Sequence, residues 1–320
     1  MSLSINQNLF ALNAANNLVS HYGKLGTSIQ RLSTGLRINS AKDDAAGLAV
    51  REEMRADIGV LNQGIRNAEM AMNMLQTAES SLAIIDEKLT RMAQLAEQAA
   101  TGTYTHRQRQ IIHSEFAAMA AEIDRIATSS EFAGRKLLDG SLSTSSSNNF
   151  TVGQWLQTGP GTITSEMYDS DGEYGDNVGL KVHFGIHNRR AEDYYFVNIG
   201  DFTTNGLFRS IGDPTAAAAS KISVSTQHLA QLALDYIDSA IYVKEQGRAY
   251  LGSMMERLEN TIKHLTAQSE HLQAAESNIS DVDIAHEMTE FVKNQVLTQA
   301  ATAMLAQANS LPQMALRLLG

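Results

Sequence analysis

A seven-residue repeat of apolar side chains is the feature that most limits how this chain can fold. The repeat passes through Met54, Leu61, Ala68, Leu75, Leu82, Leu89 and Ala96. Its companion position holds Ile58, Ile65 and Met72. Such spacing keeps an apolar stripe on one face of an α-helix and is typical of coiled coils. An unbroken helix over residues 42–100 would be on the order of 85 Å long at 1.5 Å per residue. We therefore expect elongated helical packing.

Shorter helices are predicted before and after this long one. The first carries a stripe of apolar residues and stops at Gly35; the stripe is Leu18, Tyr22, Leu25, Ile29 and Leu32. Ser40, with Asp43 three residues on, is predicted to cap the long helix, which would begin near Ala41. Thr105 and Gln108 form a capping box for a third, antiparallel helix, whose stripe is Ile112, Phe116, Met119, Ile123 and Ile126.

A second long helix is predicted in the C-terminal half, antiparallel to the first. Its periodicity begins at Leu229, Tyr236, Val243 and Tyr250, slips by one residue, and continues at Leu251, Leu258, Leu265, Leu272 and Ile279. Ser280 to Asp283 repeats the capping pattern, and a last helix begins at Ile284. We expect that helix to end at Leu311-Pro312.

The middle of the chain changes character to Gly, Ser, Thr, Asp and aromatic residues. Short β-like runs occur at residues 150–152, 180–184 and 194–199 and predict a hairpin-bearing insert. The fold class is therefore mainly α: a long antiparallel coiled-coil bundle with a small β-hairpin insert. Three parts are predicted: an inner terminal-helix domain (1–40 and 280–320), a long-helix rod domain (41–140 and 215–279) and a surface-facing insert (141–214).

Composition narrows the possible partners. The net charge is −10 and the 25 Lys and Arg residues are interspersed with acids, so we expect no nucleic acid. No stretch approaches the roughly 20 apolar residues that span a bilayer, and the N-terminus lacks a basic region followed by an apolar run. We expect no membrane partner, no cofactor, and export without a cleaved signal peptide. With no cysteine in the chain, stability must come from packing.

The terminal helices carry more apolar surface than one pairing within the chain can cover. We therefore predict that they bind other copies of the protein. The predicted polymerisation interface consists of Leu18, Tyr22, Leu25, Ile29, Leu32, Ile284, Met288, Val292, Val296 and Met304.

Two long segments resemble one known family. Residues 31–47, RLSTGLRINSAKDDAAG, resemble the signature segment of bacterial flagellins, and residues 303–313, AMLAQANSLPQ, resemble the end of the same family. The resemblance covers roughly residues 1–140 and 220–320. It implies a structural subunit that polymerises into the helical filament used for swimming, with the terminal helices inside and the long helices around them.

The resemblance also implies a location and partners. Flagellins leave the cell through the flagellar type III channel, a chaperone holds their C-terminal helix, and hook-associated proteins adjoin the extracellular filament. Arg91, Leu95 and Glu115 match positions that flagellins present to the vertebrate Toll-like receptor for flagellin. Ala93 and Gln94 depart from the charged pattern of strongly activating relatives.

Other sites and functions were weighed against this interpretation. His286-Glu287 begins like a zinc-hydrolase helix, but Glu290 stands where a second His is needed, so no catalytic or metal site is predicted. An acidic run at residues 169–176 is better explained as a solvated turn than as a calcium loop. Candidate O-glycosylation sites are Ser143, Thr144, Ser145, Ser146 and Ser147, although an unmodified loop is the favoured interpretation. The alternatives are a hook–filament junction subunit, a flagellin with a metallopeptidase insert, and an intracellular coiled-coil scaffold.

Overall fold

The structure is a computed structural model, and it describes residues 8–143, 179–189, 192–208 and 222–319. The chain divides into two compact units, one made of residues 1–59 and 269–320 and the other of residues 60–268. The division falls inside both long helices, α2 (Ala45–Ala100) and α6 (Gln227–Ser280). The three parts predicted from the sequence describe layers of an assembly of many chains. The structure is of one chain, so the division into these three parts stays a prediction.

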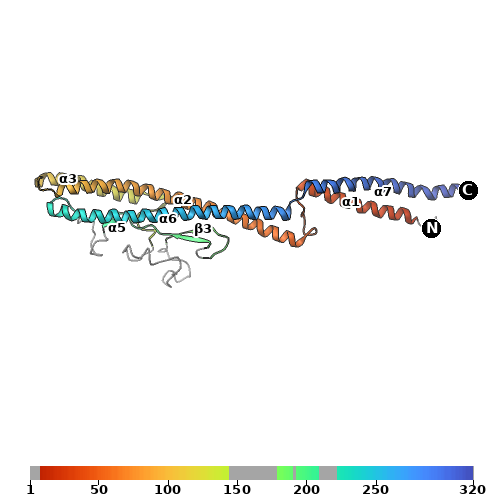
Figure 1. Ribbon diagram of the computed structural model, residues 1–320, viewed down its shortest axis with the longest axis horizontal. Helices are drawn as coiled ribbons and strands as arrows, with labels where there is room; N and C mark the ends of the chain where they lie inside the picture. Colours follow the sequence, from red (N-terminus) through yellow and green to blue (C-terminus); the bar gives the residue numbers. More distant parts are fainter. Residues whose placement is uncertain (1–7, 144–178, 190–191, 209–221, 320) are drawn as a thin grey trace. The chain divides into compact units, whose positions relative to one another are not determined.

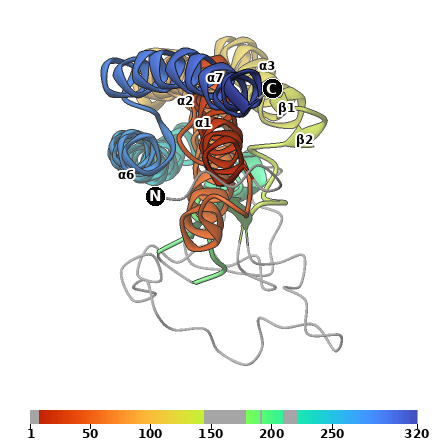
Figure 2. The ribbon, with the colours of Figure 1, turned by 90° about the vertical axis from the view of Figure 1, so that its right-hand side faces the viewer.

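The first unit is built on two terminal helices. Helices α1 (Leu9–Thr34) and α7 (Ile284–Leu319) lie side by side (Figures 1 and 2). Asn8 caps α1, because its side-chain oxygen accepts a hydrogen bond from the backbone N–H of Ala11, and its Nδ2 donates to the carbonyl of Ala308 at 2.7 Å. Gly35 has φ of 74° and ends α1, as predicted.

The two predicted capping serines, Ser40 and Ser280, do not cap α2 and α7. Helix α2 begins at Ala45, where Asp44 accepts from the N–H of Gly47, and not near Ala41. Ser40 donates instead to the carboxylate of Asp43, which also accepts two backbone N–H groups and closes a separate turn. Ser280 is likewise the last residue of α6, and Asp283 caps α7. The predicted start of α7 at Ile284 is confirmed.

Helix α7 does not end at Leu311-Pro312 but runs on to Leu319. A proline in a helix removes one N–H donor and strains the preceding turn. The residues that follow Pro312 include Gln, Met, Ala, Leu and Arg, which are strong helix formers, so the helix continues.

The core of the second unit follows the predicted repeat on α2. Six of its positions, Leu61, Ala68, Leu75, Leu82, Leu89 and Ala96, are at most 1% exposed. The companion position was predicted wrongly, because Ile58, Ile65 and Met72 are only half-buried. The buried companion line lies three residues after each repeat position and consists of Gly64, Ala71, Ala78, Ile85, Met92 and Ala99. Four of these six are Gly or Ala, so helices can approach closely here.

Helix α3 (His106–Ser129) begins with the predicted Thr105–Gln108 capping box.

The apolar repeat of helix α6 does not slip by one residue, in contrast to the prediction. Its buried line keeps one seven-residue repeat throughout, at Ala230, Ile237, Lys244, Leu251, Leu258 and Leu265. The predicted line at Leu229 and Tyr236 lies beside this seam, and Leu229 is 36% exposed.

Two hairpins complete the second unit. Strands β3 (Leu180–His183) and β4 (Tyr194–Val197) pair antiparallel, as predicted for these two runs. The third predicted run, residues 150–152, lies outside the described residues. Strands β1 (Glu131–Phe132) and β2 (Arg135–Lys136) were not predicted. Helix α5 (Thr204–Phe208) is held on α3 where Thr204 donates from its N–H and its hydroxyl to Asp124.

Candidate assembly surface and the groove beneath the hairpin

The contact between α1 and α7 within one chain buries several polar side chains. Arg31 of α1 forms an ion pair with the buried carboxylate of Glu287 at 3.5 Å. Ser28, Asn294 and Thr298 are also buried here, and the side chains of the last two bond to carbonyls of their own helix. The apolar part of this seam consists of buried Ala308 and of half-buried side chains such as Leu18, Leu25 and Leu32, so the seam is mixed.

Large apolar side chains point away from the seam instead. We call the following exposed residues the assembly surface: Leu9, Phe10, Leu12, Val19, Tyr22, Ile29, Ile284, Met288, Val292, Val296, Leu297 and Met304. Their exposed fractions run from 37% to 72%. Exposed apolar surface of this extent marks a site of interaction with other proteins.

The predicted polymerisation residues separate into two groups. Tyr22, Ile29, Ile284, Met288, Val292, Val296 and Met304 belong to the assembly surface. Leu18, Leu25 and Leu32 are half-buried within the chain. Leu9, Phe10, Leu12, Val19 and Leu297 were missed, although the apolar character of the N-terminal residues was visible in the sequence. The part of every one of these residues in polymerisation stays a prediction.

The three predicted receptor residues do not share one surface. Arg91 of α2 and Glu115 of α3 are about half-exposed and form an ion pair at 2.6 Å. Leu95 is 1% exposed and lies in the core. The four-residue spacing predicts that Leu95 lies beside Arg91 on α2. Leu95 belongs to the buried face of the helix, however, and Arg91 lies just outside that face.

The predicted absence of a metal site can be compared with the geometry at several positions. Glu287, the acid of the zinc-hydrolase-like segment, is bound to Arg31, and Glu290 is bound to Lys293. In the described part of the chain, no group of three or more His, Asp or Glu side chains is placed to hold a metal. The acidic run 169–176 and Thr144, Ser145, Ser146 and Ser147 lie outside the described residues. Ser143 is described and is half-buried.

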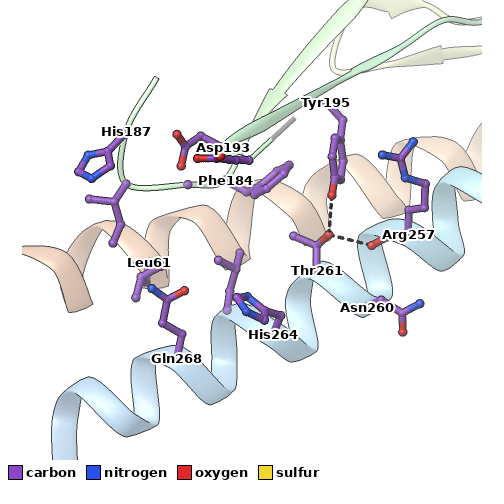
Figure 3. Close-up of a pocket in the computed structure, with 14 residues that line it drawn as sticks. Leu61, Phe184, His187, Asp193, Tyr195, Arg257, Asn260, Thr261, His264 and Gln268 are labelled. Carbon is purple, nitrogen blue, oxygen red and sulfur yellow. Dashed lines mark hydrogen bonds between the residues drawn. The ribbon is translucent and has the colours of Figure 1, made fainter. Parts of the chain in front are cut away.

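A groove of about 500 Å³ lies between the β3–β4 hairpin and helices α2 and α6 (Figure 3). Its side chains hold the hairpin in place. The Arg257 guanidinium lies 4.4 Å from the centre of the Tyr195 ring, and the Tyr195 hydroxyl is 3.4 Å from that of Thr261. From α2, the Asn67 side chain donates to the carbonyl of His183 at 3.0 Å. These contacts anchor the hairpin to both long helices.

None of the described helices is both long enough and apolar enough to cross a membrane. The long helices and the hairpin define a mainly α-helical fold whose terminal helices carry large exposed apolar side chains.

Comparison with known proteins identifies the family. The model of the bacterial flagellin N-terminal helical region matches residues 5–143, and that of the C-terminal helical region matches residues 234–319. The chain is 38% identical over 315 residues to a flagellin of Halalkalibacterium halodurans, covering 98% of this chain and 99% of that one. It is 37% identical to the flagellar filament 33 kDa core protein of Treponema phagedenis, covering 98% and 99%. The chain belongs to the bacterial flagellin family.

A solved structure supports the fold alone. It is described as a candidate flagellar hook-associated protein from Vibrio parahaemolyticus, with 16% identity and a TM-score of 0.53. The match covers 75% of this chain and 100% of that one.

Proposed function

We propose that this chain is the repeating structural subunit of a flagellar filament, the helical propeller of swimming bacteria. The observation that carries the proposal is the distribution of side chains on α1 and α7. Their shared seam leaves the large apolar side chains of the assembly surface exposed. Only other copies of the chain, or similar subunits, would bury that surface in the filament.

The same surface accounts for open-ended growth. Burial of apolar surface contributes roughly 25 cal/mol per Å² removed from water, so the exposed apolar side chains of two helices favour association strongly. A head-to-tail contact that does not close into a ring generates a helical filament. Family membership agrees with this arrangement.

We propose the remaining assignments because the resemblance to flagellins implies them. Residues 1–40 and 280–320 form the filament core, residues 41–140 and 215–279 the layer around it, and residues 141–214 face outward. The protein is extracellular and is exported through the flagellar type III channel, without a cleaved signal peptide. A chaperone binds the C-terminal helix before export, and hook-associated proteins adjoin the filament. The role is structural and not enzymatic, and requires no cofactor.

Recognition by the vertebrate Toll-like receptor for flagellin is proposed to depend on Arg91 and Glu115. Their charged groups are exposed and paired, while the buried Leu95 would act only by supporting the helix. A receptor-reporter assay on monomer tests this: Arg91→Ala with Glu115→Ala should lower the response, and an unchanged response would remove the proposal. Leu95→Met, which conserves volume in the core, is the matched control and should respond like the parent chain.

Assembly is tested at Val296, which is 57% exposed on α7. Val296→Asp places a charge on the assembly surface and should keep the chain in the supernatant after sedimentation. Val296→Ile keeps the side chain apolar and should still form filaments. If the Asp variant sediments as filaments to the same extent as the Ile variant, the assembly surface is misassigned.

A further inference from the structure

A layer of charged side chains crosses the core of the second unit between α2 and α6. Lys244 of α6 is fully buried, and its Nζ donates to the carboxylates of Asp86 on α2 and of Glu245 beside it. One turn further along α6, Arg248 binds Glu79 of α2 at 2.6 Å. Lys244 occupies a position of the seven-residue repeat that is otherwise apolar.

The rest of that repeat fixes the alignment of the two helices only weakly. Leucine recurs every seven residues on α2 at Leu75, Leu82 and Leu89, and on α6 at Leu251, Leu258 and Leu265. Sliding one helix past the other by seven residues, about 10 Å at 1.5 Å per residue, brings repeat positions of α2 opposite repeat positions of α6 again. Apolar packing alone therefore distinguishes poorly between the two alignments.

The charges do distinguish them. In the observed alignment, Lys244 meets Asp86, and Arg248 meets Glu79 and lies 3.9 Å from Asp86. Counting seven residues toward the C-terminus of α2, from Asp86 to residue 93, places the buried lysine opposite Ala93, so that only Glu245 of its own helix remains beside it among the acids named here. Removing one partner of a buried ion pair is strongly destabilising.

A slide in the opposite direction also loses pairs. Counting seven residues back, Lys244 and Arg248 both come near Glu79, whereas Asp86 then faces Ile237 and loses its bases on α6. Both acids and both bases are matched only in the observed alignment.

We propose that the Lys244–Asp86 pair is the determinant of the axial register between α2 and α6. Polar side chains at otherwise apolar repeat positions specify register in coiled coils at some cost in stability. The inference goes beyond filament formation, since it concerns how one chain aligns its own helices.

Two glycines offer a rival explanation. A β-carbon at Gly64 of α2 would stand 2.0 Å from the carbonyl oxygen of Phe184, and one at Gly247 of α6 would stand 2.3 Å from the Phe202 ring. Phe184 and Phe202 therefore fit closely against α2 and α6 at positions that glycine leaves open, and we call these two contacts the glycine notches. If the glycine notches set the register between α2 and α6, the Lys244–Asp86 ion pair would be dispensable.

Distance measurements between spin labels separate the two explanations. The chain contains no cysteine, so Ser80→Cys on α2 and Ala267→Cys on α6 provide two unique exposed sites. Full-length chain, kept below the concentration at which it assembles, should give one main distance by pulsed electron paramagnetic resonance. Asp86→Leu with Lys244→Leu removes both charges together and should add a second distance displaced by up to about 10 Å.

Matched variants make the outcome decisive. Glu79→Gln with Arg248→Gln removes the neighbouring, partly exposed pair and should leave the single distance unchanged. Exchanging the charges, Asp86→Lys with Lys244→Asp and with Glu245→Gln so that no like charge adjoins the new aspartate, should restore it. A leucine variant that stays helical and keeps one unshifted distance would overturn the proposal in favour of the glycine notches. If the leucine variant unfolds, the exchanged chain decides: native distance supports the proposal, and a mixed distance or unfolding overturns it.

Discussion

Gly64 of α2 lies directly against the carbonyl oxygen of Phe184, which leads from strand β3 into the hairpin loop. An added β-carbon would stand 2.0 Å from that oxygen, a distance that no real contact allows. Gly64→Ala should therefore displace the hairpin from α2 and lower the thermal unfolding temperature, with a loss of about 1 to 3 kcal/mol as for overpacked core sites. Calorimetry of the monomer measures the change.

Gly252→Ala on α6 is the control for that experiment. Nothing lies within 4 Å of the position of its β-carbon. Replacing glycine by alanine in a helix usually stabilises it by roughly 0.5 to 1 kcal/mol. A Gly64 variant as stable as the Gly252 variant would show that the hairpin does not rest on Gly64.

The second prediction concerns alkaline pH. Burial raises the pKa of the Tyr250 phenol, and its hydroxyl accepts a hydrogen bond from the N–H of Asn198 at 3.3 Å. Because the folded state prefers the neutral phenol, its contribution to stability is complete below pH 10, the ordinary pKa, and is lost as pH rises through the raised value.

Tyr250→Phe removes the titrating group. At neutral pH it should cost about 1 kcal/mol for the lost hydrogen bond. Above pH 10 the difference in free energy of unfolding between variant and parent should become smaller, as measured by urea unfolding followed by circular dichroism. Tyr242→Phe, at a side chain that is 58% exposed, should change the free energy of unfolding neither at neutral pH nor above pH 10. A constant difference across this range would contradict the assignment.

The third prediction is that α1 and α7 are largely unfolded in the free monomer and become helical on assembly. Helices gain most of their stability from packing, and the pairing of α1 with α7 leaves the large apolar side chains of the assembly surface unpacked. Ordering costs roughly 1 to 2 kcal/mol per residue of backbone entropy. Fast hydrogen exchange over residues 9–34 and 284–308 in monomer, slowing in filaments, is expected; slow exchange before assembly would mean that the helices are preformed.

The fourth prediction separates assembly from folding. A chain lacking residues 1–40 and 280–320 loses the assembly surface but keeps the core of the second unit, so it should remain a helical monomer. Circular dichroism checks the helicity and sedimentation checks the size. Filaments formed by this truncated chain would show that polymerisation does not require the terminal helices.

The sequence predicted the long helices well where large apolar residues form the core. The repeat from Leu61 to Ala96 on α2 is visible because leucine dominates it. The companion line was missed because Gly64, Ala71 and Ala78 are too small to be read as core residues. On α6 the repeat seemed to slip because Lys244 interrupts it with a charge, and its burial depends on Asp86, 158 positions away in the sequence.

Helix ends were predictable where the sequence offers a single candidate for the capping residue. Gly35 and the Thr105–Gln108 box acted as expected. At the start of α2, two adjacent acids compete: Asp43 closes a turn with Ser40, and Asp44 takes the cap. The assembly surface was partly found. Which side of each terminal helix faces the partner helix depends on the polar contacts of Arg31 and Glu287, and periodicity does not show these.

The ion pair between α1 and α7 has a consequence for exchange between molecules. When these helices separate, Ser28, Glu287, Asn294 and Thr298 become exposed and can hydrogen-bond water, so opening the pair costs less than opening a wholly apolar one. An α1 helix from a second molecule presents the same Arg31 to the same Glu287. We therefore expect that neighbouring molecules can exchange terminal helices and form a domain-swapped pair.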